Sequence, residues 1–126
     1  MIDFHTHIFP EKIAGKTLEF LAARCHISPY TNGMADGLRA STREAGLSFS
    51  IVLPVVTKPS QFDSINRFAL QMQDPGDGLL SFGGIHPDNE DYRAKLRYIK
   101  DAGLKGIKLH PDYQGVMIDD IRFKRI

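Results

Sequence analysis

Short runs rich in β-branched and aromatic residues alternate along the chain with stretches whose apolar residues recur at helical spacing. The first pattern is typical of strands and the second of helices that bury one face. Strands are predicted over residues 1–7, 47–56, 79–85 and 105–110. Helices are predicted over residues 10–24, 34–45, 61–72, 90–102 and 117–126, and a loop is predicted over residues 112–115. Strands that alternate with helices predict right-handed crossovers and a parallel sheet.

One junction between helix and strand occurs twice in the sequence. Residues 45–47 and 102–104 both read Ala-Gly-Leu, and a proline follows nine residues after each alanine, at Pro54 and Pro111. Proline ends the hydrogen-bonded ladder of a strand and turns the chain into a loop. Repeated βα units of this kind predict an α/β fold of the (β/α)8 TIM-barrel type, truncated here to about four βα units, a half-barrel.

Composition narrows the class of protein. Of the 126 residues, 42% are hydrophobic and 25% are charged, as in ordinary globular domains, and we expect one partial domain over residues 1–126. The net charge of +1 gives no reason to expect a nucleic-acid partner. Cys25 is the only cysteine, which favours a reducing cytoplasm. The longest apolar run, residues 51–56, is too short to span a membrane, and no basic signal segment precedes it.

The first predicted strand carries the candidate chemistry. His5 and His7 are two positions apart, so in a strand both imidazoles point to the same face, which Asp3 shares. Two imidazoles side by side reach one ion at about 2.0–2.1 Å if the ion is zinc. The alternative is that two polar residues end a strand by chance, because a His-x-His pair alone is a weak motif.

Other histidines also end predicted strands. His86 follows the third strand and His110 the fourth, so four of the five histidines fall at the carboxyl ends of strands, where barrel sites lie. The fifth, His26, lies in a predicted loop (residues 26–33) beside Cys25, and we interpret it as solvated.

Three motifs in this order resemble the amidohydrolase superfamily, and most of all its amidohydrolase-related branch, which includes aminocarboxymuconate-semialdehyde decarboxylase. They are residues 2–10 (IDFHTHIFP), 84–87 (GIHP) and 106–111 (GIKLHP), and the resemblance covers essentially the whole chain. It implies a distorted (β/α)8 barrel with a divalent metal, commonly zinc, on His5 and His7. It also implies hydrolysis of amide, ester or lactone bonds, or decarboxylation of aromatic and unsaturated acids.

The resemblance extends to the first half of such a barrel. The family's remaining ligands, a later histidine and an aspartate that acts as general base, have no counterpart in residues 1–126. We therefore expect this chain alone to lack part of the catalytic site.

The remaining site candidates keep two interpretations each. His110 is a candidate catalytic residue, as a further metal ligand or as a hydrogen-bond donor to substrate or to a developing oxyanion; otherwise it caps backbone groups. Lys108 lies on the same strand face as His110 and is a second catalytic candidate. In related barrels a lysine at the fourth strand can be carbamylated and bridge two metal ions. Otherwise Lys108 is half of an interior ion pair. His86 is a candidate substrate-binding residue, or it packs at the strand end.

Two other functions stay open. A polymerase-and-histidinol-phosphatase-type metal phosphoesterase also ends its first strand in His-x-His, and an inert half-barrel would serve as a structural module. As partners we expect a small-molecule substrate, no nucleic acid and no membrane. A half-barrel exposes two sheet edges and bare inward side chains, so we also expect a homo-oligomer or a missing C-terminal half. The side chains expected to be bare are Ile51, Leu53, Ile107 and Leu109.

Overall fold

The structure is a computed structural model, and it describes residues 1–26 and 28–126. Ile27, inside the predicted loop, lies outside the described residues. The chain forms two compact units, the first made of residues 1–52 and 74–80 and the second of residues 53–73 and 81–126. Each unit is described by itself, and the expectation of one partial domain stays a prediction.

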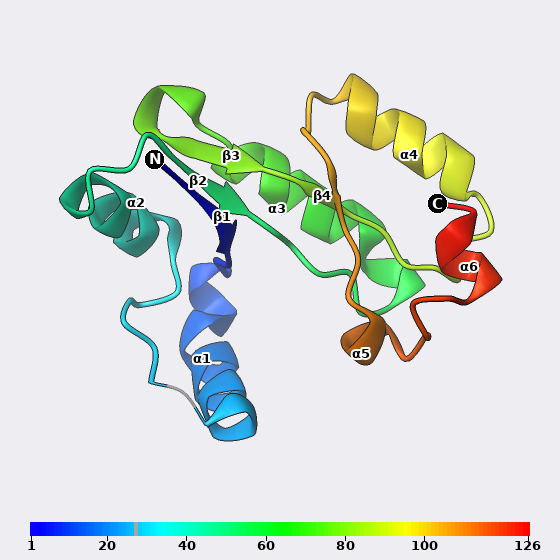
Figure 1. Cartoon of the computed structure of the whole chain (residues 1–126), viewed down its shortest axis with the longest axis horizontal. Helices are drawn as coiled ribbons and strands as arrows, with labels where there is room; N and C mark the ends of the chain where they lie inside the picture. Colours follow the sequence, from blue (N-terminus) through cyan, green and yellow to red (C-terminus); the bar gives the residue numbers. More distant parts are fainter. Residues whose placement is uncertain (27) are drawn as a thin grey trace. The chain divides into compact units, whose positions relative to one another are not determined.

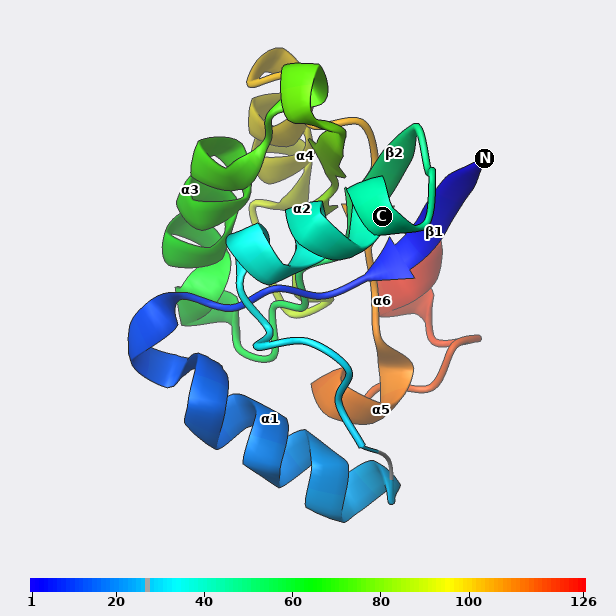
Figure 2. The ribbon, with the colours of Figure 1, turned by 90° about the vertical axis from the view of Figure 1, so that its left-hand side faces the viewer.

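The first unit is built on a three-stranded sheet in the order β1-β2-β3. Its elements are β1 (Ile2–Thr6), α1 (Glu11–Cys25), α2 (Ala35–Glu44), β2 (Phe49–Val52), η2 (Pro75–Asp77) and most of β3 (Leu79–Ser81). β1 and β2 pair in parallel and lie side by side (Figure 1 and Figure 2). The predicted first two strands and their parallel arrangement are therefore confirmed.

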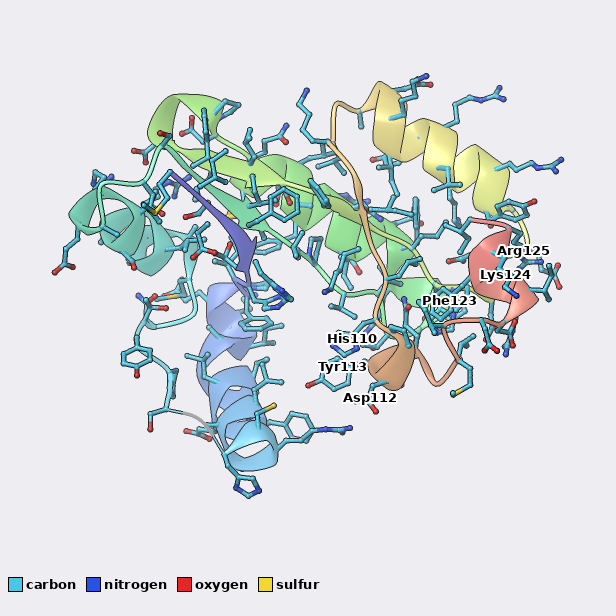
Figure 3. The ribbon with its side chains drawn as sticks, in the orientation of Figure 1. His110, Asp112, Tyr113, Phe123, Lys124 and Arg125 are labelled. Atoms are coloured by element: carbon cyan, nitrogen blue, oxygen red, sulfur yellow. The ribbon has the colours of Figure 1, made fainter. Side chains whose placement is uncertain are left out.

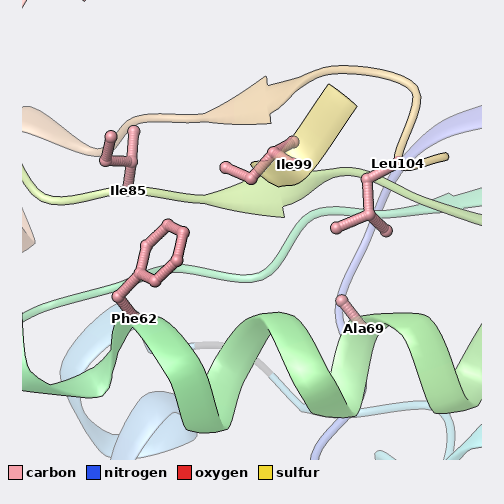
Figure 4. Packing of buried hydrophobic residues seen from close by; sticks show 5 residues of the cluster. All are labelled: Phe62, Ala69, Ile85, Ile99 and Leu104. Atoms are coloured by element: carbon pink, nitrogen blue, oxygen red, sulfur yellow. The ribbon is translucent and has the colours of Figure 1, made fainter. Parts of the chain in front are cut away.

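The second unit contains a parallel pair of short strands and the helices that cover one of its faces. Its elements are η1 (Pro59–Gln61), α3 (Phe62–Met72), β4 (Gly83–Gly84), α4 (Tyr92–Asp101), β5 (Ile107–Lys108), α5 (Pro111–Gln114) and α6 (Ile121–Lys124). The apolar core lies between these helices and the strands, as Figure 4 shows for Phe62, Ala69, Ile85, Ile99 and Leu104.

This core corrects one expectation. Ile107 and Leu109 pack against the helix-side cluster and do not face a missing half. Ile51 and Leu53, also expected to be bare, are only 5% and 6% exposed. Because successive side chains of a strand point to opposite faces, Lys108 lies on the face of β5 opposite to Ile107.

The predicted third strand is divided into β3 and β4 at Phe82. Asn66 of α3, which is fully buried, bonds the second part of this strand. Its amide nitrogen donates to the Gly84 carbonyl at 2.8 Å and its oxygen accepts from the Gly84 N–H at 2.9 Å. A side chain thus occupies both backbone groups that a neighbouring strand would use. The structure also forms the helical turn α5 where a loop was predicted.

The repeated helix–strand junction is confirmed in detail. Gly46 and Gly103 both adopt a left-handed backbone, with φ of 64° and 88°. The following leucine N–H then returns to the last helical turn, from Leu47 to the Thr42 carbonyl at 3.0 Å and from Leu104 to the Ile99 carbonyl at 3.2 Å. Glycine is favoured at such helix ends because a side chain disfavours positive φ.

A mixed α/β fold with parallel strands is therefore shown, and the described residues do not close a barrel. Within the same residues, no helix has the length and apolar character needed to cross a bilayer.

Candidate active site

His5 and His7 lie together at the carboxyl end of β1. Their ring centroids are 5.0 Å apart with an interplanar angle of 66°. Both side chains are exposed. Between them, Thr6 is buried, and its hydroxyl donates to the Ile51 carbonyl at 2.8 Å. Thr6 therefore fixes the strand end from which the two imidazoles project.

The local backbone departs from a regular strand. The register with β2 shifts between Asp3 and Thr6, and the His5 N–H donates to the Asp3 carboxylate at 3.2 Å. Ile2 and Phe4, on the other face, are 53% and 61% exposed. The alternation of side chains along a strand predicted that His5 and His7 share a face. The exposure of Ile2 and Phe4 on the opposite face was not expected.

The spacing of His5 and His7 fits a shared metal ion. A tetrahedral ion bonded at about 2.0–2.1 Å to two imidazole nitrogens places the ring centroids about 5 Å apart, which is the distance observed, 5.0 Å. The pair supplies two of the three or four protein ligands that zinc usually has. The described residues contain no group of three or more histidine, cysteine, aspartate or glutamate side chains arranged to hold a metal.

His86 and His110 lie at matching positions in the second unit. β4 and β5 pair Gly84 with Lys108, and each histidine stands two residues beyond that pair. Each histidine therefore follows the carboxyl end of one of two adjacent parallel strands. His86 is buried at 4% exposure, and His110 is half-buried.

Each of these two imidazoles accepts a backbone hydrogen bond at Nδ1. The Asp88 N–H donates to His86 at 3.1 Å, and the Tyr113 N–H donates to His110 at 3.3 Å. The Tyr113 ring also stacks on His110, with centroids 4.2 Å apart (Figure 3). A neutral imidazole that accepts at Nδ1 carries its proton on Nε2, so the geometry assigns both histidines as Nε2–H donors.

Gln114 holds the strand ends, and sequence reasoning missed it. Its amide nitrogen donates at 2.8 Å to the carbonyls of Val56 and Ile85, and its oxygen accepts from the His110 N–H at 2.9 Å. The side chain is buried and thus joins three backbone segments. The sequence signal was a glutamine four residues after a strand-ending histidine, inside a stretch predicted to be a loop.

Burial and neighbouring charges together set the pKa of His86. The pKa of His86 is lowered, first because burial disfavours the imidazolium. The Asp88 carboxylate, 3.7 Å from Nδ1, opposes this shift, and Arg122 adds to it. Arg122 binds Asp88 and Asp120, both at 2.8 Å. Arg125 donates to the Pro87 carbonyl at 2.8 Å, so two arginines around α6 hold this loop.

Lys108 is half-buried and precedes His110 on the same strand face. Its partner in the ladder, Gly84, has no side chain, and a Cβ there would lie 2.7 Å from Val56 Cγ2 and 3.1 Å from the Pro54 carbonyl. Val56 and the Pro54 backbone therefore approach this glycine closely. His26 ends α1 in a left-handed conformation and is exposed, in agreement with its interpretation as solvated.

The predicted site residues belong to two units of the structure. His5 and His7 belong to the first unit, and His86, Lys108 and His110 belong to the second. Their assembly at one common rim stays a prediction.

The chain is an α/β protein built from repeated βα units with parallel strands. Histidines lie at or just after the carboxyl ends of these strands. Within that class, the family model for amidohydrolases matches residues 2–125, and the chain belongs to this family. Membership indicates a function of the hydrolase or decarboxylase type. Searches of curated proteins and of solved structures gave no match.

Proposed function

We propose that this chain provides the N-terminal part of a metal-dependent hydrolase of amide, ester or lactone bonds, or of a related decarboxylase. The observation that carries the proposal is the 5.0 Å separation of the His5 and His7 rings, which suits two imidazoles on one ion. Zinc is the metal we propose, because imidazole nitrogen is among its preferred ligands. When bound, a metal of this kind lowers the pKa of water toward about 7 and polarises a carbonyl group.

The chain's own residues have distinct roles in this proposal. His5 and His7 hold the ion through neutral imidazoles. In the second unit, His110 donates its Nε2–H to a substrate oxygen that gains negative charge, and His86 binds substrate in the same way. Lys108 adds a positive charge on the face that carries His110. We regard a metal-ligand role for His110 as the weaker alternative, since Nε2 carries the proton.

Zinc titration by calorimetry tests the metal site. We expect weak binding that a chelator reverses, because two imidazoles provide an incomplete ligand set. Binding should be lost when His5→Ala and His7→Ala are combined, and retained in the matched control His26→Ala, which removes an exposed histidine from the end of α1. Tight binding that survives the double substitution would contradict the proposal.

Zinc content and turnover test the reaction class. One or two ions, with turnover of an ester and lactone panel that depends on His5 and His7, would support a hydrolase. Three ions would instead favour the phosphoesterase alternative. A chain that binds zinc but turns over no substrate, alone or with a complementary half, would be the inert module.

We also propose that β1 pairs with further polypeptide, from a second copy or from a complementary C-terminal half. β1 stands at the edge of its sheet, and Ile2 and Phe4 are 53% and 61% exposed. Edge strands offer unpaired backbone groups to other chains. Light scattering at micromolar concentration should therefore show association. A monomer whose melting temperature is independent of concentration would contradict this.

The cytoplasm is the proposed compartment, because the single cysteine, Cys25, forms no intrachain disulfide.

A further inference from the structure

We propose that residues 86–89 form an acid-released latch, which holds α6 in the second unit as long as the His86 imidazole is neutral. The latch goes beyond the function proposed above, and it depends on neither a metal ion nor a substrate. Three observations lead to it, and all of them lie within the second unit.

The first observation is that the latch is buried and bonded within itself. His86 and Asn89 are only 4% and 7% exposed, and Pro87 is fully buried. The Asn89 side-chain oxygen accepts from the His86 N–H at 3.2 Å, and the His86 Nδ1 accepts from the Asp88 N–H at 3.1 Å. The second of these bonds requires a neutral ring, because a proton on Nδ1 would turn the acceptor into a donor.

The second observation is that α6 is attached to the latch. Arg122 Nη1 donates to the Asp88 carboxylate at 2.8 Å. Arg125 Nη2 donates to the Pro87 carbonyl at 2.8 Å and to the Asn89 carbonyl at 3.5 Å. Since α6 has only four residues, it is too short to be stable alone. Its position therefore depends on contacts of this kind.

The third observation is the set of charges around the ring. Burial lowers the pKa of His86, the Asp88 carboxylate at 3.7 Å from Nδ1 raises it, and Arg122 lowers it further. The other titratable groups on the neighbouring elements are Lys58, Glu90, Asp91, Tyr92, Lys108, His110, Asp112, Tyr113, Asp120, Lys124 and Arg125. The ring is thus placed to change its charge in mild acid.

Protonation of His86 opens the latch. The proton that binds Nδ1 turns the bond from the Asp88 N–H into a contact between two donors, and it leaves a charge on a buried ring. The Asp88 carboxylate is then shared between the imidazolium and Arg122, which weakens the attachment of α6. Release of α6 uncovers Phe123, which is 6% exposed when the latch is closed.

The direction of the pH dependence follows from the lowered pKa. A histidine whose pKa is lowered by folding stabilises the folded state above its unfolded pKa, and this contribution disappears as the pH falls toward the folded value. The latch is therefore closed above pH 6.5, the ordinary pKa of histidine, and opens in more acidic solution.

The test follows the full chain by NMR from neutral pH into the acid range, with a chelator to keep it metal-free. The His86 ring should titrate below 6.5, and the Asp88 N–H resonance should shift with the same midpoint. Below that midpoint the ratio of open to closed latch should rise about tenfold per pH unit, as expected for one proton. Resonances of Phe123 and Ile126 should report this release, and a dye that binds apolar surfaces should become fluorescent.

Substitution sharpens the measurement. His86→Gln keeps an acceptor that does not titrate, so its latch should stay closed over the same range. His26→Gln, at an exposed position of the first unit, is the matched control and should open like the unsubstituted chain. Because substitution at a buried site can also disturb folding, the spectra of the unsubstituted chain test the proposal without any variant.

Three results would overturn the latch. One is a His86 ring that titrates at or above 6.5. Another is a ring that titrates while Phe123 and α6 keep their resonances. The third is release of α6 that persists in His86→Gln and disappears in Asp120→Asn, because the acid response would then belong to a carboxyl group.

Discussion

The two groups of strand-end histidines differ in what surrounds them. His5 and His7 are exposed neighbours on one strand, with ring centroids 5.0 Å apart. His86 and His110 stand on two adjacent strands, and a backbone N–H from the following turn is bonded to each Nδ1. The same sequence signature, a histidine that ends a strand, therefore occurs in two different settings. We propose metal ligation for the first group and hydrogen-bond donation for the second.

The residues that follow each histidine explain the difference. His86 and His110 both begin the sequence His-Pro-Asp, whereas His7 is followed by Ile8-Phe9-Pro10. Proline directly after the histidine turns the chain at once, so an N–H two or three residues later reaches the ring. After His7 the chain continues to the buried Ile8. The identity of the next residue thus helps to decide how the imidazole is used.

Replacing Gln114 should have the largest effect, and it should affect only the second group of histidines. Gln114→Leu leaves two carbonyls and the His110 N–H without their partner. Each buried, unsatisfied group costs about 1–3 kcal/mol, so we expect the free energy of unfolding to fall by about 3 kcal/mol or more. Urea unfolding measures this, and Gln71→Leu, at an exposed position of α3, is the control.

The zinc affinity of His5 and His7 gives a second readout of the same variant. Under native conditions Gln114→Leu should leave it unchanged, since that pair belongs to the other unit. An unfolding free energy close to that of Gln71→Leu would show that Gln114 does not hold the strand ends.

Two glycine substitutions, one in each unit, should change the free energy of unfolding in opposite directions. In Gly84→Ala the new methyl group would lie 2.7 Å from Val56 Cγ2 and 3.1 Å from the Pro54 carbonyl, and backbone cannot yield easily. Overpacking of this kind costs about 1–3 kcal/mol. Gly15→Ala, inside α1, meets nothing within 4 Å, and it should stabilise by about 0.5–1 kcal/mol because alanine favours helices.

Thermal melts of the two glycine variants measure whether each substitution raises or lowers the melting temperature. If Gly84→Ala melts at or above the temperature of the unsubstituted chain, the strands next to His86 are not packed as closely as described.

Much of the fold could be predicted from local pattern. Hydrophobic periodicity located the long helices, and the two Ala-Gly-Leu junctions were recognised because a left-handed glycine is a local requirement. The bonds of Asn66 to Gly84 could not be predicted, since the two residues lie 18 positions apart in the sequence. Ile107 and Leu109 were wrongly expected to be bare, because the cluster against which they pack is formed by residues distant in sequence.

The candidate site was predictable to a similar extent. Residue type and spacing singled out His5, His7, His86 and His110. The protonated nitrogen of each imidazole depends on backbone donors in the turns, and Gln114 depends on three segments that meet only in the folded unit. Such contacts between distant segments are not encoded in any short stretch of sequence.

The smallest effect we predict concerns acid sensitivity near His86. Hydrogen bonds from the Arg122 side chain, and then from its backbone N–H, lower the pKa of Asp120 from 3.8 to about 2. A carboxyl group with a lowered pKa in the folded state stabilises the fold above its unfolded pKa, and this contribution disappears as the pH falls toward the folded value. The stabilisation should therefore be complete above about pH 4 and lost between about pH 4 and pH 2.

Asp120→Asn should remove this part of the pH dependence, because an amide does not titrate over that range. The measurement is urea unfolding at neutral pH and across the acid range, with Asp119→Asn, at the exposed neighbouring position, as the control. Since Arg122 also binds Asp88 at 2.8 Å, the variant should loosen the loop after β4 while leaving His5 and His7 unaffected. An acid dependence identical to that of Asp119→Asn would mean that the Asp120–Arg122 pair does not hold the loop that positions His86.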